Sequence, residues 1–155
     1  MIRGIWQLPA GKLSVLFLSL IILLAIFGPA LAPYDPLVGT DHVLAHPSAQ
    51  HWLGTDYLGR DVLSRILAGS TISVLGSVQV AVIALFVGAI PGILSVYLGK
   101  LFEWLTLRLV DTLIALPFLV FAVAVTALLG NGIPQAMLVV GIMVSPAFYR
   151  VARAA

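Results

Sequence analysis

The fold of this chain is decided by residues 51–70, HWLGTDYLGRDVLSRILAGS, a long polar interruption between apolar segments. Of the 155 residues, 61% are hydrophobic and only 9% are charged, and the mean hydropathy is +1.15. A soluble domain of this size could not cover its surface with so few charged side chains. The composition therefore predicts an all-α polytopic membrane protein, and the interruption marks where the chain meets water.

Charge-free runs define the expected membrane spans, since a helix rising 1.5 Å per residue must cross roughly 30 Å of hydrocarbon. The run over residues 66–99 would be about 50 Å long as a single helix, so we expect it to break at residues 69–71. The run over residues 112–149 is cut by the turn-forming residues 130–134. The predicted spans are residues 13–32, 72–98, 112–129 and 133–149.

Three of the prolines in these spans interrupt them and free backbone carbonyls there, so each of the three marks an expected bend. They are Pro91, Pro117 and Pro146. The first span has an alternative as a cleaved signal peptide, because Ala30 and Ala32 give a small-x-small pattern. A retained anchor is favoured, because its apolar run of 20 residues exceeds the usual signal core of roughly 7 to 15 residues.

The distribution of basic residues predicts the orientation of the chain. Four spans place both termini and the loop over residues 99–111 on one side of the membrane. Six of the eight basic residues fall on that side: Arg3, Lys12, Lys100, Arg108, Arg150 and Arg153. Only Arg60 and Arg65 lie opposite, so the positive-inside rule makes both termini cytoplasmic and residues 33–71 extracytoplasmic.

A short amphipathic helix over residues 57–68 is expected in the extracytoplasmic segment, after a proline-rich linker. Thr55 or Asp56 could cap it, and Asp61 and Arg65 stand at i, i+4. On physical grounds alone this helix could be a solvated interfacial helix without a ligand. Residues 1–71 and 72–155 then form the two parts of the chain, the second carrying spans two to four.

Histidines and carboxylates of the same segment are a suitable ligand set for a divalent metal. They are His42, His46, His51, Asp41 and Asp56. Their spacing defines no shared helical face, so we expect a solvated loop and no metal site. Cysteine is absent, which excludes disulfides and thiolate sites.

The second span carries small residues at intervals of three and four, a pattern that lets helix backbones approach closely in lipid. The expected packing positions are Ser77, Ala81, Ala84, Gly88 and Gly92, with Ser73 preceding them. Lining of a substrate path is the alternative role for this stripe. Gln79 in the outer half of the span is the polar candidate for lining a path, because an amide prefers a partner helix or water to lipid.

Catalysis by these residues is not expected. Gly99 and Lys100 do not form a phosphate-binding loop, because Leu94 and Leu101 stand where that loop needs Gly and Ser or Thr. Residues 99–111 instead have leucine, phenylalanine and tryptophan spaced to lie in the membrane interface. No hydrolytic motif and no ionisable pair within a span is present, and no cofactor is expected.

Residues 51–65 with Gly69 resemble the signature of the inner-membrane permeases of dipeptide, oligopeptide and nickel ABC importers, of the "C" type. The signature block comprises Gly54, Thr55, Asp56, Gly59, Arg60, Asp61, Ser64, Arg65 and Gly69. Further agreement covers the whole chain, in Ala-Pro-Tyr-Asp-Pro at 32–36, Arg108-x-x-Asp111 with Pro117, Leu-Gly-Asn-Gly at 129–132, and Tyr149-Arg150-x-x-Arg153.

The resemblance implies a type I importer subunit with six spans, which pairs with a second permease, two cytoplasmic ATPases and an extracytoplasmic binding protein. The family's ATPase-docking loop follows the fourth span, so we interpret the chain as the N-terminal part of such a permease. Short peptides are the expected substrate, with nickel as the alternative within the family. A truncated membrane scaffold or assembly partner that does not transport is the alternative from a different class.

Overall fold

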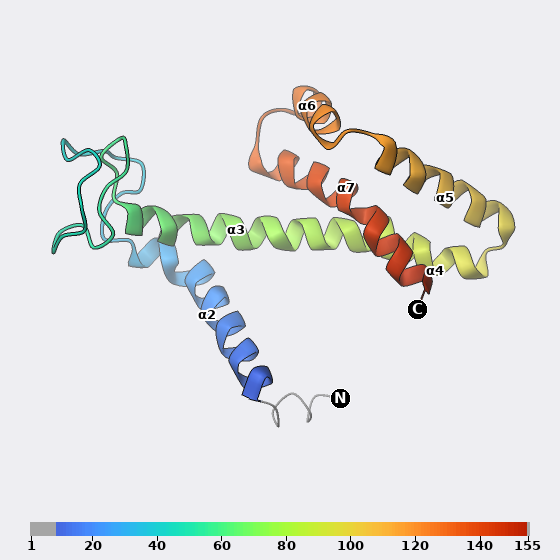
Figure 1. Cartoon of the computed structure of the whole chain (residues 1–155), viewed down its shortest axis with the longest axis horizontal. Helices are drawn as coiled ribbons and strands as arrows, with labels where there is room; N and C mark the ends of the chain where they lie inside the picture. Colours follow the sequence, from blue (N-terminus) through green and yellow to red (C-terminus); the bar gives the residue numbers. More distant parts are fainter. Residues whose placement is uncertain (1–8, 155) are drawn as a thin grey trace. The chain divides into compact units, whose positions relative to one another are not determined.

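The computed structural model describes residues 9–154, and its regular structure is helical (Figure 1). The elements are α2 (Pro9–Leu31), α3 (Val62–Ala84), the π-helix η1 (Leu85–Ala89), α4 (Ile90–Tyr97), α5 (Lys100–Ala115), α6 (Phe118–Leu129) and α7 (Ile133–Ala154). The predicted all-α polytopic class is confirmed, because several of these helices are long and apolar enough to cross a membrane.

Two compact units divide the chain, Met1–Leu75 and Gly76–Ala155, and α3 runs through the boundary. The first unit contains α2, the non-helical residues 32–61 and the beginning of α3. The second contains the rest of α3 and all later helices. Residues 32–61, which we call the outer segment, are made of turns and bends linked by backbone hydrogen bonds.

Among residues 9–154, three stretches satisfy the length and hydropathy of a span: α2, the continuous stretch Val62–Tyr97, and α7. The predicted first, second and fourth spans therefore correspond to helices. The third does not form one straight helix. Residues 112–115 end α5, Pro117 separates it from α6, and the two helices are bent by 97°. At 12 residues α6 is only about 18 Å long, too short to cross the hydrocarbon alone.

The expected break at residues 69–71 is wrong, because α3 continues through it. The hydroxyl of Ser70 donates to the carbonyl of Leu24 at 2.7 Å, and that of Thr71 donates to the carbonyl of Ala25. Pro29 has no N–H to give to that Ala25 carbonyl four residues earlier in α2. The polar residues that suggested a break therefore join α3 to α2.

The separate amphipathic helix over residues 57–68 is also wrong. Helix begins at Val62, and residues 62–68 are the first two turns of α3. Tyr57 and Leu58 lie in a turn that ends at Gly59, where φ is +73°. Glycine adopts this backbone conformation without steric cost, and it is incompatible with a helix through the same residues.

The three expected bends have different outcomes. Pro117 breaks the chain between α5 and α6. Pro91 is the second residue of α4, just after η1, and the N–H of Ile90 before it bonds to the carbonyl of Leu85, five residues earlier. A π-helical turn of this kind is a recognised irregularity within helices. Pro146 lies inside the continuous helix α7.

Candidate functional site: the outer segment and the α7 contact face

Asp61 joins three parts of the outer segment. Asp61 as a whole is 3% exposed. Its Oδ1 lies 2.9 Å from His51 Nδ1, and its Oδ2 accepts the backbone N–H and the hydroxyl of Ser64 at 2.8 and 2.7 Å. The Ser64 hydroxyl in turn accepts the backbone N–H of Tyr34 at 3.1 Å. Asp61 is therefore the N-cap of α3 and holds the start and the middle of the outer segment against it.

Asp56 is the second centre of the segment. It accepts the backbone N–H groups of Leu58 and Arg60 at 2.8 and 3.0 Å, and pairs with the side chains of Arg60 and Arg65 at 2.9 and 3.1 Å. The expected cap by Thr55 or Asp56 and the expected Asp61–Arg65 pair are thus wrong. Helical spacing would bring Arg65 to Asp61, but the capping bonds turn that carboxylate toward Ser64 and His51.

The surroundings of both carboxylates lower their pKa values. Burial raises the pKa of Asp61, but the hydrogen bonds from the Ser64 backbone and hydroxyl and from His51 outweigh it and hold the pKa below its ordinary value. Desolvation likewise raises the pKa of Asp56, but hydrogen bonds from the backbone and side chain of Arg60 and from the backbone of Leu58 lower it below its ordinary value. Both groups are therefore anions at neutral pH.

The remaining signature residues shape the backbone of the segment. Gly59 at φ +73° lies so close to the chain that an added Cβ would stand 2.0 Å from the carbonyl oxygen of Thr40. Gly54, also at positive φ, meets the carbonyl of Ala45 in the same way. Thr55 donates to the carbonyl of His42 and accepts the N–H of Ala45. Gly69 has no such neighbour and is an ordinary position in α3.

Among residues 9–154 no three His, Asp or Glu side chains gather as a metal site. His51 is engaged by Asp61, and its ring lies 5.0 Å from that of Tyr34. His51 was expected as a possible metal ligand and as the first residue of the signature stretch 51–65, but its pairing with a capping carboxylate was not predicted. Its position ten residues before Asp61 carries no periodic signal that would have shown the pairing.

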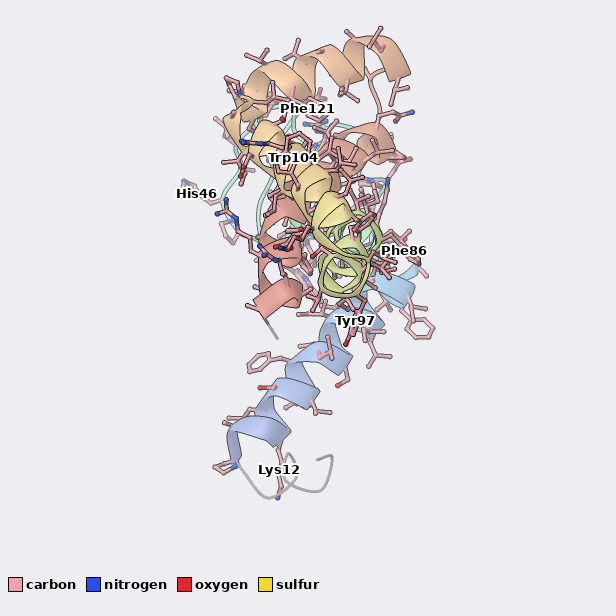
Figure 2. The ribbon with its side chains drawn as sticks, turned by 90° about the vertical axis from the view of Figure 1, so that its right-hand side faces the viewer. Lys12, His46, Phe86, Tyr97, Trp104 and Phe121 are labelled. Atoms are coloured by element: carbon pink, nitrogen blue, oxygen red, sulfur yellow. The ribbon has the colours of Figure 1, made fainter. Side chains whose placement is uncertain are left out.

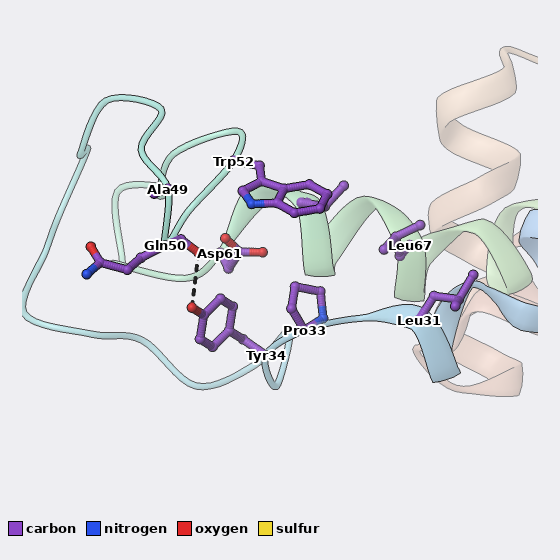
Figure 3. Close-up of a pocket in the computed structure, with 9 residues that line it drawn as sticks. Leu31, Pro33, Tyr34, Ala49, Gln50, Trp52, Asp61 and Leu67 are labelled. Carbon is purple, nitrogen blue, oxygen red and sulfur yellow. Dashed lines mark hydrogen bonds between the residues drawn. The ribbon is translucent and has the colours of Figure 1, made fainter.

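A cavity of about 440 Å³ opens beside this hydrogen-bonded core (Figure 3). Its lining residues are Leu31, Pro33, Tyr34, Ala49, Gln50, Trp52, Asp61, Leu63 and Leu67. On one side of the cavity, the Tyr34 hydroxyl donates to the carbonyl of Gln50 at 3.0 Å (Figure 3). Most of the wall is apolar, and it includes the end of α2 and the first turns of α3.

In the second unit, α7 packs against η1 and α4 through glycine. A Cβ added at Gly88 would stand 2.2 Å from the carbonyl oxygen of Ser145, and one at Gly92 would stand 2.6 Å from that of Tyr149. Ala84 is fully buried nearby. Backbones at this distance gain dispersion contacts that a larger side chain would prevent.

Ser77 and Ala81, the first positions of the predicted stripe, are exposed, and the contact instead passes through Gly76 and Ile83. Gly76 lies against Met137, and Ile83 lies against Gly141 of α7. The contact face of α3 is therefore displaced by one residue from the predicted stripe. We attribute the displacement to η1, because a π-helical turn holds one more residue than an α-helical turn and so rotates the face of α3 relative to that of α4. The sequence pattern assumed α-helical spacing throughout.

Gln79 lies within this same unit and donates from Nε2 to the carbonyl of Pro134 at 2.7 Å. This bond joins α3 to the beginning of α7. Its amide therefore has a helix partner in the structure, which is one of the two environments expected for it.

Helix α5 is joined to α7 by polar contacts that the sequence did not suggest. Thr106 and Tyr149 share a hydrogen bond of 2.8 Å, and Tyr149 is 1% exposed. Arg153 pairs with Glu103. Residues 99–111, whose composition suits the membrane interface, thus also contact α7. The exposed aromatic side chains Tyr97 and Trp104 on α4 and α5 are marked in Figure 2.

Comparisons of the sequence with known proteins found similar permeases. The family described as the N-terminal TM domain of oligopeptide transport permease C matches residues 9–54. A probable D,D-dipeptide transport system permease protein of Escherichia coli is 38% identical over 96% of this chain and 51% of its own length. The chain is thus similar to permease proteins of peptide transport systems. The resemblance found in its signature block is thereby confirmed.

Two further proteins similar to this chain are named for other substrates. A di/tripeptide transport system permease protein of Pseudomonas aeruginosa is 40% identical over 99% of the chain and 54% of its own length. A glutathione transport system permease protein of Escherichia coli O1:K1 is 39% identical over 90% and 47%. The chain spans about half the length of the curated relatives it matches.

Proposed function

We propose that this chain forms part of the permease of an ATP-driven importer for short peptides. The observation that carries the proposal is the alignment with peptide and glutathione permeases over nine-tenths or more of the chain. The described helices support it, since three stretches of them are long and apolar enough to span a membrane. A short peptide is the chemistry common to the substrates named for these relatives.

The proposed assembly contains a second permease subunit, two cytoplasmic ATPases and an extracytoplasmic substrate-binding protein. ATP hydrolysis belongs to the ATPases. Within the permease, residues 1–71 anchor the chain and provide the outer segment, and residues 72–155 supply further spans. Gln79 is the candidate for lining the path, and the signature block holds the outer segment in shape.

The proposed location is the bacterial inner membrane, with both termini of the chain in the cytoplasm. The distribution of basic residues supports this orientation. Because the chain has no cysteine, the labelling of a single introduced cysteine reports the side of the membrane on which that residue lies. Leu37→Cys in the outer segment should react with an impermeant maleimide added to intact spheroplasts, and Leu101→Cys on α5 should react only after lysis. Both positions are exposed. Reaction of both from the same side would overturn the orientation.

The transport proposal is tested by uptake through the complete permease that contains this sequence, assembled with its partners in vesicles. Radiolabelled dipeptides, tripeptides, glutathione and nickel are offered in parallel, with and without internal ATP. We expect ATP-dependent accumulation of a short peptide and none of nickel. Accumulation of nickel alone would show that the substrate is nickel and not a short peptide. Absence of uptake by an assembled complex would favour the alternative of a membrane scaffold that does not transport.

A further inference from the structure

The cavity of about 440 Å³ in the first unit has no role in the hydrogen-bonded core beside it. We call it the outer pocket, and its lining residues are those shown in Figure 3. Its volume falls within the roughly 300–1,000 Å³ that is typical of small-molecule sites. The pocket is thus large enough for a ligand, and its chemistry indicates which one.

The walls of the outer pocket continue the exposed apolar surface of α2 and α3. Leu31 is the last residue of α2 and is 63% exposed, next in space to the apolar side chains that cover α2. Leu63 and Leu67 belong to the first turns of α3, inside the candidate span Val62–Tyr97. Apolar surface of this kind is costly to leave against water and is stable against hydrocarbon.

The opposite end of the outer pocket is polar and is formed by the outer segment. Trp52 is 71% exposed, and among the described residues none accepts a hydrogen bond from its indole N–H. Asp61 also lines this end, but both of its carboxylate oxygens are hydrogen-bonded to His51 and Ser64, so they are not available to bind a cation. An apolar body with an available N–H donor is the arrangement that places tryptophan at the level of lipid headgroups.

We propose that the outer pocket binds the ester end of a phospholipid acyl chain. The first methylenes lie against Leu31, Leu63 and Leu67, and the indole N–H of Trp52 donates to an ester carbonyl oxygen. The lipid then fills the gap between the end of α2, the beginning of α3 and the outer segment. This binding site is independent of whether the protein transports peptides.

The test uses the complete permease in vesicles of phosphatidylethanolamine and phosphatidylglycerol that contain a lipid with a diazirine near the ester end of one acyl chain. After irradiation, labelled positions are mapped by mass spectrometry of peptides. We expect labels at Trp52 and Leu63. Phe27, an exposed residue of α2, serves as the reference for an inserted and folded chain.

Ala49→Phe fills the outer pocket and should lower labelling at Trp52 and Leu63 several-fold, with the reference label at Phe27 unchanged. Val43→Phe, an exposed position of the outer segment away from the pocket, is the matched control and should change neither. If Ala49→Phe loses the reference label, Leu67→Phe narrows the pocket from the helix side.

Two results would overturn the proposal. Absence of labels at the pocket in the presence of the Phe27 label would show that protein or water occupies it. Unchanged labelling of the pocket in the filled variant would show that the labels come from lipid passing over the surface. Neither result depends on uptake, so the lipid site can fail while the transport proposal stands.

Discussion

Substitution of Gly88 by alanine tests whether α7 is held by backbone contact. The added Cβ would stand 2.2 Å from the carbonyl oxygen of Ser145 and 3.0 Å from the Cβ of Phe148. Ordinary contact begins at 3.4 Å, so the helices must separate by about 1.2 Å. The obstructing atom is backbone and cannot rotate away. Overpacking of this kind costs about 1–3 kcal/mol.

Gly69→Ala is the matched control for this change, because it is the same substitution in the same continuous helical stretch. No atom lies within 4 Å of the Cβ that it would add. Since alanine is favoured over glycine within a helix by about 0.5–1 kcal/mol, Gly69→Ala should be neutral or stabilising. Both free energies of unfolding can be measured by SDS titration in mixed micelles, with tryptophan fluorescence as the signal.

The expected outcome is a loss of stability for Gly88→Ala together with no loss for Gly69→Ala, and a greater loss for Gly88→Leu. If Gly88→Ala unfolds at the same SDS fraction as the unsubstituted protein, close approach of α7 to this turn does not contribute to stability. The small residues of the stripe would then be free for another role, such as lining a path.

Three of the polar contacts can be tested by further substitutions. Thr71→Val removes the donor to the carbonyl of Ala25 and should cost about 0.6–1.7 kcal/mol in the same titration, and an unchanged midpoint would show that the carbonyl finds another donor. Because the pKa of Asp61 is lowered in the folded state, its contribution to stability is present above the ordinary carboxyl pKa and is lost as the pH falls through the folded value. Protease resistance of the outer segment should accordingly fall in strong acid, and Asp61→Asn should lower it already at neutral pH; resistance equal to that of the parent would contradict the capping role. Glu103→Arg should weaken the joining of α5 to α7, and the double variant with Arg153→Glu should recover it, as measured by the SDS midpoint; failure of the double variant to recover would assign the loss to other contacts.

The sequence predicted two of the spans closely from the length of their uninterrupted apolar runs. Helices α2 and α7 agree with their expected runs to within a few residues, because hydropathy and length alone define a span. The same criterion failed at residues 112–129, where hydropathy carries no information about the direction of the chain after Pro117. A proline in an apolar run predicts that a helix is disturbed, but the 97° angle depends on the packing of both arms.

The residues of the outer segment were found from their motif, but their contacts were not. Spacing of four residues suggested that Asp61 faces Arg65, because helical geometry was assumed for both. Asp61 is the residue at which the helix begins, so its side chain bonds to the backbone of Ser64 and its remaining oxygen is available to His51. Long-range pairs of this type have no period in the sequence and follow only from the folded loop.

Hydroxyl groups compensate for proline in both units of the chain. Pro29 frees the carbonyl of Ala25, and the Thr71 hydroxyl of the neighbouring helix donates to it. Pro146 frees the carbonyl of Ile142, and the preceding Ser145 donates to it at 2.7 Å.

An unpaired carbonyl in hydrocarbon costs several kcal/mol, so a proline inside a span is stable only where a donor is near. In the first unit that donor belongs to a second helix, and the proline therefore fixes which residues of α3 lie against α2. In the second unit the donor is the hydroxyl of Ser145, on the same turn of α7 as Pro146. No second helix is needed as a donor there, and the backbone of α7 at Ser145 packs against Gly88. The prolines of these two spans thus act through the hydroxyls beside them, one by joining two helices and the other by keeping a helix continuous.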